Sequence, residues 1–266
     1  MKYLYGKTIV LTGASSGIGR EMAKQLVNGY GATVIGIGRN EEKLKSLKSE
    51  LGEKFRYQAM DVSVKENWST FANALKTEGA GIDLLINNAG IFPKFERVEN
   101  LTSEQIQEVM NVNFYASVYG VESMLELLGE RGGIVNICSS GSLCTVVGTS
   151  AYSASKSAMK GYTEALILEE KDRYVGLIYP GTTATELFRN DENTKNSALD
   201  LVAMSAEKMS KKILKKIDKK RKRAVVGLDA KAMNLLAKLA PVWGLSLIAW
   251  VMKVSRSKVF GRVFKD

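Results

Sequence analysis

A tyrosine and a lysine four positions apart, Tyr152 and Lys156, are the side chains in this sequence best suited to move a proton. In a helix this spacing places both side chains on one face. A free phenol has a pKa near ~10, which is too high for a base at neutral pH. Lowering it by ~2–3 units takes about 3–4 kcal/mol of preference for the phenolate, and the positive charge of Lys156 is one source of that preference. The pair is therefore a candidate general acid and base.

Histidine is absent from the 266 residues, and this restricts the chemistry further. The chain can form neither a Ser-His-Asp nor a Cys-His nucleophile system, and it has no HExxH zinc motif. Cys138 and Cys144 match no CxxC or zinc-ligand pattern, so we expect packing or loop thiols in a reduced intracellular protein, and no metal site. Residues 1–7 include a glycine and a lysine where a signal peptide needs an unbroken apolar segment, which predicts a cytoplasmic protein.

A glycine-rich turn, TGASSGIG at residues 12–19, follows the first apolar run. Glycines between a strand and a helix let the backbone approach a pyrophosphate, whose charge is stabilised at the helix N-terminus. The spacing is GxxxGxG rather than GxGxxG, and such a turn can also be purely structural. The turn therefore indicates a dinucleotide site that needs support from other residues.

Arg39 lies where a dinucleotide-binding unit specific for NAD usually has an acid, about 20 residues beyond the last glycine. A carboxylate there would repel a 2′-phosphate, whereas a guanidinium can bind it through two hydrogen bonds. We therefore predict NADP(H) rather than NAD(H) as the cofactor. The alternative is a solvated arginine at the start of a helix.

These residues need a framework, and the order of apolar segments predicts one. Apolar, β-branched runs alternate with amphipathic stretches of helical length over the first 180 residues. Runs that are apolar at successive positions are typical of parallel strands buried on both faces. The alternation predicts an α/β fold, a Rossmann-type doubly wound parallel sheet in a single domain. Strands are expected at 8–11, 33–37, 55–58, 84–86, 133–137 and 174–178, with a strand-like piece at 224–227, and helices near 18–29, 40–50, 64–78, 103–128 and 152–171.

Further motifs stand at the expected strand ends. The sequence NNAG occupies 87–90, Asn113 lies in the long helix, Ser139 follows the fifth strand, and residues 180–185 read PGTTAT. Together with TGxxxGxG and YxxxK, these motifs resemble the short-chain dehydrogenase/reductase family, in the family's order, over about residues 6–186.

The resemblance implies a role for each of four catalytic residues. Tyr152, whose pKa an oxidised nicotinamide would help Lys156 to lower, would protonate the nascent alkoxide in reduction or deprotonate the alcohol in oxidation. Lys156 would also hold the nicotinamide ribose, Ser139 would hydrogen-bond the substrate oxygen, and Asn113 would support a water in the proton relay. Ser139 is preferred to Ser140 because it lies thirteen residues before the tyrosine, as in the family pattern.

The resemblance also implies the cofactor contacts. An adenine-binding pair is expected at Asp61 and Val62, the adenosine ribose side at 88–90, and the carboxamide contacts at Thr183 and Thr185. The complete predicted cofactor set is Gly13, Ser15, Ser16, Gly17, Ile18, Gly19, Arg39, Asp61, Val62, Asn88, Ala89, Gly90, Tyr152, Lys156, Pro180, Gly181, Thr183 and Thr185.

The net charge of +10 is unevenly distributed. Residues 206–266 carry 17 basic against four acidic side chains, whereas residues 1–205 carry 21 against 24. We therefore divide the chain into a cofactor-binding and catalytic domain, 1–205, and a basic, then apolar, helical extension, 206–266, packed on the same domain. A lysine-rich helix over 207–223 has an apolar stripe, so its lysines are expected to form a solvated face, with contact to anionic phospholipid, nucleic acid or an acidic carrier domain as the alternative. Residues 206–223 contain no aromatic side chain, which argues against nucleic acid.

An apolar run of fourteen residues, 239–252, follows between Lys238 and Lys253. A bilayer span needs about 20 apolar residues, so the run is too short to cross a membrane. We favour a subunit contact or a substrate lid. The alternative is an element on a membrane surface, for which basic flanks and tryptophans are typical.

These patterns predict an NADP(H)-dependent oxidoreductase that interconverts a secondary alcohol and a ketone. Mostly apolar segments beyond the strand ends, at 91–95, 143–147 and 187–188, favour a bulky hydrophobic substrate such as a hydroxysteroid, although they could equally be core or subunit contacts. A 3-oxoacyl-thioester reductase of the same family is the alternative enzyme. A non-catalytic dinucleotide-sensing regulator is the alternative of another class, but its expected signature, loss of Tyr152 or Lys156, is absent. The resemblance also implies a homodimer or homotetramer.

Overall fold

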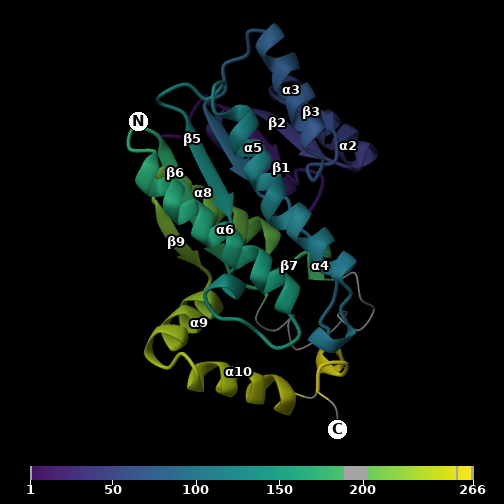
Figure 1. The fold of residues 1–266 in the computed structure, drawn as a ribbon. Helices are drawn as coiled ribbons and strands as arrows, with labels where there is room; N and C mark the ends of the chain where they lie inside the picture. Colours follow the sequence, from purple (N-terminus) through teal and green to yellow (C-terminus); the bar gives the residue numbers. More distant parts are fainter. Residues whose placement is uncertain (1, 189–202, 256, 265–266) are drawn as a thin grey trace.

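The computed structural model of the protein describes residues 2–188, 203–255 and 257–264 (Figure 1). Its centre is a seven-stranded sheet in the order β3-β2-β1-β4-β5-β6-β9, and every neighbouring pair is parallel. The doubly wound sheet expected from the sequence is confirmed. The strands are β1 (Thr8–Thr12), β2 (Thr33–Gly38), β3 (Phe55–Ala59), β4 (Leu84–Asn87), β5 (Gly133–Ile137), β6 (Tyr174–Pro180) and β9 (Arg223–Val226).

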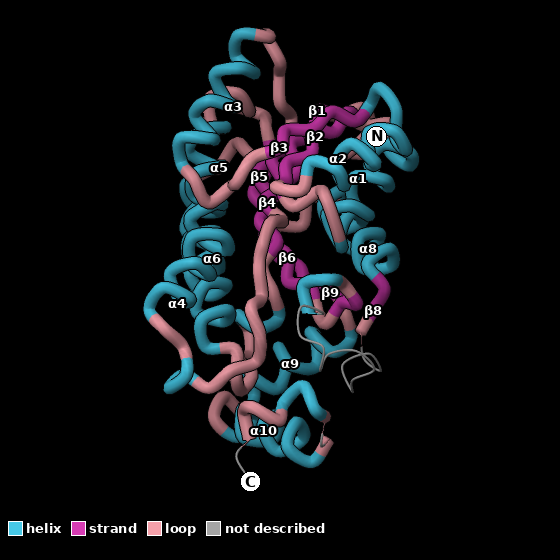
Figure 2. Tube along the Cα trace, turned by 90° about the vertical axis from the view of Figure 1, so that its right-hand side faces the viewer, coloured by secondary structure: helices cyan, strands magenta, loops and turns pink. Residues whose placement is uncertain are grey.

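Helices cover both faces of the sheet (Figure 2). Successive strand residues point to opposite faces. Ile9 therefore packs with α1 (Gly17–Tyr30), α2 (Glu41–Leu51) and α8 (Ala206–Asp218), whereas Val10 packs with the helices on the other side. Those helices are α3 (Lys65–Thr77), α5 (Ala116–Met124) and α6 (Ser150–Glu169).

The long helix expected over 103–128 is interrupted. It consists of α4 (Ser103–Met110), a π-helical segment (Asn111–Tyr115) and α5. Thr102 and Gln105 form a reciprocal capping box at its start, with the Thr102 hydroxyl accepting from the Gln105 N–H. A π-helical segment inserts one extra residue per turn and is frequent at functional sites, and this one contains Asn113.

The chain crosses the middle of the sheet between β1 and β4. From β1 it proceeds outward to β2 and β3, then returns to β4 on the other side and continues to β5 and β6. In sheets of this kind the crevice at the carboxyl ends of the two diverging strands is the usual ligand site. A separate parallel pair, β7 (Thr183–Ala184) with β8 (Met204–Ser205), lies beyond the end of β6.

The basic segment 206–266 begins inside the main body. The buried face of α8 contains Met209, Ile213, Leu214 and Ile217, which belong to the same core cluster as α1, so its lysines are left at the surface. The helix expected to reach residue 223 ends at Asp218, because Arg223 starts β9, which pairs with β6.

After β9 come α9 (Leu228–Leu239) and α10 (Trp243–Val254), which lie beyond the carboxyl edge of the sheet (Figure 1). In the part of the chain that the structure describes, no helix combines the length and apolarity needed to cross a bilayer.

Candidate active site

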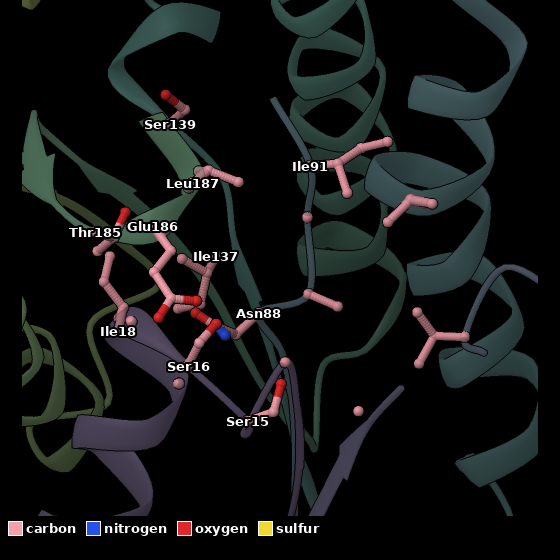
Figure 3. A pocket seen from close by; sticks show the side chains of 18 of the residues that line it. Ser15, Ser16, Ile18, Asn88, Ile91, Ile137, Ser139, Thr185, Glu186 and Leu187 are labelled. Carbon is pink, nitrogen blue, oxygen red and sulfur yellow. The ribbon is translucent and has the colours of Figure 1, made fainter. Parts of the chain in front are cut away.

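A cavity of about 360 Å³ opens at the carboxyl ends of the central strands, and Figure 3 shows its lining. This volume is within the range of small-molecule and cofactor sites. Every residue of the predicted cofactor set lines it, and so does Ser139. Asn113 does not line it and lies behind the wall.

The glycine-rich turn can pass close to a ligand because its three glycines, Gly13, Gly17 and Gly19, present bare backbone to the cavity. Gly13 and Gly17 have φ angles of +70° and +52°, which side chains rarely adopt. A Cβ on Gly19 would overlap the carbonyl oxygen of Gly13 and lie 2.6 Å from Asn88 Nδ2. Residues 15–19 line the cavity, so the N-terminal end of α1 faces it. Such a helix end with bare backbone suits a pyrophosphate.

Thr12 joins this turn to the second polar loop of the cavity. Its hydroxyl accepts hydrogen bonds from the N–H groups of Asn88 and Ala89, both at 2.9 Å, and its carbonyl accepts one from Asn88 Nδ2 at 3.0 Å. The ends of β1 and β4 are thereby fixed relative to each other at the point where the strand order reverses.

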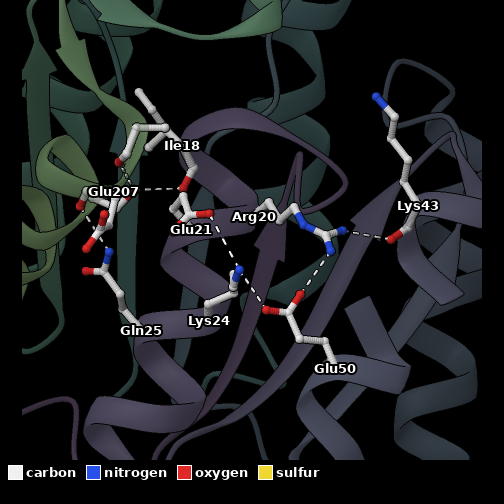
Figure 4. A network of polar contacts seen from close by, with 10 residues as sticks. Ile18, Arg20, Glu21, Lys24, Gln25, Lys43, Glu50 and Glu207 are labelled. Carbon is white, nitrogen blue, oxygen red and sulfur yellow. Dashed lines mark hydrogen bonds and ion pairs between the residues drawn. The ribbon is translucent and has the colours of Figure 1, made fainter. Parts of the chain in front are cut away.

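The position of α1 is fixed by a polar network on its outer side (Figure 4). Arg20 Nη2 donates to Glu50 of α2 at 3.0 Å, and Lys24 Nζ lies 2.6 Å from the same carboxylate. The hydrogen bond from Lys24 holds the pKa of Glu50 below its usual value. Gln25 Nε2 donates to the carbonyl of Glu207 in α8 at 3.0 Å. Each exposed pair contributes little stability alone, but together they orient α1 against both neighbours.

Tyr152 and Lys156 lie one turn apart on α6, and both are buried; Lys156 is 3% exposed. Lys156 Nζ donates to the carbonyl of Ile137, at the end of β5, at 3.1 Å. Burial lowers the pKa of Lys156. Burial raises the pKa of Tyr152 to about 12, against a hydrogen bond with Ser139 that lowers it. The lowered pKa expected from Lys156 and an oxidised nicotinamide together is therefore not reached by the protein side chains alone, and Tyr152 is a protonated donor at neutral pH.

Ser139 and Ser140 have different surroundings. Ser139 lines the cavity and its hydroxyl accepts from the N–H of Gly141 at 3.1 Å, whereas Ser140 is buried and does not line the cavity. The hydrogen bond between Ser139 and Tyr152 places a hydroxyl next to the phenol. Of the two serines, Ser139 is thus the one positioned to touch a substrate oxygen.

Asn113 is fully buried, and its amide is used to brace the backbone. Its Oδ1 accepts from the N–H of Ile91 at 2.7 Å, and its Nδ2 donates to the carbonyl of Ile91 at 3.0 Å and to Ser155 Oγ at 3.1 Å. A Cβ on Gly90 would lie 3.1 Å from Asn113 Oδ1 and 3.5 Å from Lys156 Nζ, so the two side chains approach the same glycine. The structure therefore places Asn113 next to the site and not in the cavity.

At the ends of β2 and β3 the cavity is lined by Arg39, directly after β2, and Asp61, after β3. Burial would raise the pKa of Asp61, but hydrogen bonds from the Ser63 hydroxyl and N–H, at 2.7 and 2.9 Å, and the charge of Arg39 hold it below its usual value. Asp61 is therefore a carboxylate fixed within its own loop, and the residue that follows β2 is a cation.

An apolar wall packs against the Tyr152 ring. The Tyr152 ring lies edge-on to Phe92 at 5.2 Å between centroids, and Phe92 in turn contacts Phe95 at 4.9 Å. The cluster also contains Met252 of α10, Val259, Phe260 and Val263, with Val146, Leu187, Ile248 and Phe264 packed against it. Two of the predicted substrate-facing segments thus contribute to this wall, and Leu187 joins it, while the side chain of Phe188 lies outside the described residues.

Sequence reasoning missed Asp229, which lies in the first turn of α9. Its Oδ2 accepts from the N–H of Thr182 at 2.6 Å, and its carboxylate occupies the space that a Cβ on Gly181 would need. A Cβ on Gly227 would also lie 2.5 Å from Asp229 Oδ1. The signal available in the sequence was an acid, Asp229, two residues after Gly227, which ends an expected strand. Asp229 belongs to the basic segment 206–266, so this segment helps to hold the 180–183 loop in place.

Sequence reasoning also missed Glu186, an acid in the cavity lining whose Oε2 lies 2.7 Å from Lys43 Nζ. A free carboxylate beside a phosphate site would be repulsive, and the ion pair compensates part of its charge.

Comparisons with known proteins identify the family of the chain. The sequence model of the short chain dehydrogenase family matches residues 7–196. The chain is 32% identical over 259 residues to 3-ketodihydrosphingosine reductase of Bos taurus, covering 90% of this chain and 77% of that one. It is 32% identical over 193 residues to 3beta-hydroxysteroid dehydrogenase 2 of Eggerthella lenta, covering 69% and 74%.

Solved structures have the same fold. A short-chain dehydrogenase from Streptomyces avermitilis superposes with a TM-score of 0.78 at 26% identity, covering 94% of this chain and 97% of that one. A short chain dehydrogenase/reductase from Burkholderia phymatum, solved in complex with NAD, gives 0.79 at 22% identity, covering 90% and 95%. The chain therefore belongs to the short-chain dehydrogenase family of oxidoreductases.

Proposed function

We propose that this protein transfers a hydride between NADP(H) and a secondary alcohol or ketone, with Tyr152 as the proton donor and acceptor. The observation that supports this most strongly is the arrangement of one cavity. One end of the cavity is the glycine-rich turn, whose bare backbone suits a pyrophosphate. The other end holds the half-buried Ser139 with the buried Tyr152 and Lys156.

The cofactor, when bound, supplies or accepts the hydride. The Ser139 hydroxyl holds the substrate oxygen beside the Tyr152 hydroxyl. In reduction Tyr152 donates its proton to that oxygen, and in oxidation it accepts the proton of the alcohol. Lys156, one turn further along α6, keeps a positive charge near the phenolate when it forms, and Asn113 keeps the loop at Ile91 in place.

Replacing Tyr152 by phenylalanine tests this proposal. The ring and its packing on Phe92 are kept, and only the hydroxyl is lost. General acid–base catalysis contributes about 10²–10⁴-fold, so kcat should fall by at least about 10²-fold while cofactor binding is retained. Turnover within tenfold of the parent would refute the assignment of Tyr152.

We infer NADP(H) as the cofactor from Arg39, the residue that follows β2 and lines the cavity. The KM values for NADPH and NADH, compared in the parent and in Arg39→Asp, test this. The parent should prefer NADPH and the variant should lose or reverse that preference. An unchanged preference would contradict the role of Arg39.

We infer a bulky hydrophobic substrate from the apolar wall beside Tyr152, built by residues such as Phe92, Phe95 and Met252. The relatives whose names specify 3-ketodihydrosphingosine and 3beta-hydroxysteroids support a lipid-like ketone or alcohol. Following NADPH oxidation at 340 nm with 3-ketodihydrosphingosine, a panel of oxosteroids, 3-oxoacyl thioesters and simple ketones ranks these classes. Preference for the thioesters would favour the alternative reductase activity.

We infer a homodimer or homotetramer and a cytoplasmic location from the family resemblance and the sequence. Sedimentation velocity of the purified protein measures the first, and cell fractionation measures the second. A monomer at micromolar concentration would contradict the proposed assembly.

A further inference from the structure

An apolar ridge runs along the outer side of α10. It consists of Trp243, Leu247, Trp250, Val251 and Val254, which recur at helical spacing and therefore share one face. Trp243 is 84% exposed and Trp250 is 61% exposed. Leu239 and Val242, in the turn before the helix, are also exposed and extend the ridge.

The opposite face of α10 is already occupied. Ile248 and Met252 pack in the apolar wall that contains Tyr152, and Gly244 fits against Leu236 of α9. A helix that is apolar all round is normally covered on all sides, and exposed apolar patches of this kind mark interaction sites. The ridge is thus a surface that a further partner would cover.

The charge around the ridge indicates which partner fits. From residue 230 to residue 265 the sequence has seven lysines and arginines and no acid, and the exposed Lys238 and Lys253 flank the ridge. Two copies that met ridge to ridge would bring these cations together, which is repulsive. Contact of the ridge with the slightly acidic body of another copy is the alternative, and the sedimenting mass measured below distinguishes it from a lipid surface.

We propose that the ridge rests on the surface of an anionic lipid bilayer, with α10 lying in the plane of the interface. Tryptophan and leucine on one side and flanking lysines are the composition of interfacial helices. At about 1.5 Å per residue, twelve residues extend about 18 Å, well short of the ~30 Å hydrocarbon core, so the helix lies on the membrane and does not span it.

This placement has a consequence for catalysis, which rests on the proposed function. α10 contacts the bilayer with one face and the wall beside Tyr152 with the other. The apolar wall that packs on Tyr152 thereby faces the lipid through α10, which favours a hydrophobic ketone taken from the membrane as the substrate.

Vesicle co-sedimentation of the full-length protein tests the docking without requiring turnover. We expect binding to phosphatidylcholine vesicles containing 30% phosphatidylglycerol and at least tenfold weaker binding to pure phosphatidylcholine, since each lysine near an anionic surface contributes on the order of fivefold. Trp68 is fully buried, so a blue shift of tryptophan fluorescence on adding vesicles reports Trp243 and Trp250. Equal partitioning into both vesicle types, or into neither, would overturn the proposal.

Matched variants separate the ridge from other exposed apolar residues. Trp243→Glu with Trp250→Glu should reduce vesicle binding at least tenfold, whereas Leu168→Glu, at a residue of α6 that is 75% exposed, should leave it unchanged. All variants should melt within 3 °C of the parent. If the double variant instead halves the sedimenting mass in the absence of lipid, the ridge is a subunit contact. Activity on a water-soluble ketone, measured without vesicles, tests the proposed function independently.

Discussion

Asp229 gives the most informative perturbation, because it joins the C-terminal segment to the loop at the end of β6. Replacing it by alanine removes the 2.6 Å hydrogen bond from the Thr182 N–H and an acid from the first turn of α9. A hydrogen bond to a charged group contributes about 1.5–3 kcal/mol, and the lower end applies because Asp229 is only half-buried. The charge at the helix N-terminus adds about 0.3–1 kcal/mol. We expect the variant to lose about 2 kcal/mol of stability.

Part of this loss should appear as weaker cofactor binding. The loop that includes Gly181 and Thr183 lines the cavity, and without its anchor it must be ordered when the cofactor binds. A cost of about 2 kcal/mol corresponds to at most about 30-fold in Kd, so a rise of about 3- to 30-fold is expected. NADPH fluorescence titration measures the Kd, and a thermal melt should show a Tm lower by about 4–8 °C.

Two controls sharpen this experiment. Asp229→Asn keeps an acceptor oxygen for the Thr182 N–H and should lose less than the alanine variant. Asp218 accepts a similar bond from the Leu4 N–H at 3.1 Å, on α8 and away from the cavity. Asp218→Ala should therefore lower the Tm and leave the Kd unchanged. If Asp229→Ala also leaves the Kd within twofold, cofactor binding does not depend on the bond to Thr182, and Asp229 only stabilises the start of α9.

Three further predictions concern the site itself. Alcohol oxidation needs the phenolate of Tyr152, and burial raises the pKa of this phenol to about 12. The rate of oxidation should therefore increase from pH 7 to pH 9.5, while the rate of reduction stays level. An oxidation rate that does not change with pH would contradict Tyr152 as the base. Gly19→Ala should weaken cofactor binding and lower the free energy of unfolding by about 1–3 kcal/mol, because the added methyl group overpacks the turn. Gly29→Ala, on the same helix with open space around it, should leave the free energy of unfolding unchanged or raise it. A urea titration measures both, and equal effects would contradict the close packing of the turn. Asn113→Ala leaves the Ile91 N–H without its acceptor and should lower the Tm more than Asn111→Ala, whose bond to Gln107 is exposed; the reverse order would argue against the brace.

The sequence predicted the strands and the grouping of the site residues correctly where a short stretch of residues carries a pattern set by its burial in the fold. Six expected strands and the piece at 224–227 are all present, within two residues at each end. In β1, β2, β4, β5 and β6 consecutive residues are buried between two helical layers, whereas the edge strand β3 is fully buried only at Phe55. The cofactor residues could be grouped because parallel strands bring their carboxyl ends to one edge. Ser139 and Ser140 could be separated only by a family spacing, and the structure now distinguishes them by their surroundings.

Other features depend on contacts that no local pattern contains. Asp229 bonds to Thr182 from 47 positions away, and Asn113, in the π-helical segment that interrupts the long helix, bonds to Ile91 from 22 positions away. The wall beside Tyr152 joins residues 92–95 to 252–263. These pairings arise from the way the chain returns to the carboxyl edge of the sheet, and composition carries no information about them.

The pairing of β9 with β6 and the packing of α8 on α1 have a consequence for synthesis. A chain emerging from the ribosome has made all residues of the first six strands well before residues 206–226 become available, and domains tend to fold as their residues appear. Until α8 arrives, the face of α1 that holds Met22 and Leu26 lacks part of its cover, and β6 has a free edge. An unpaired edge beside exposed apolar surface promotes aggregation. The nascent protein should therefore depend on chaperones until its most basic helix has been translated.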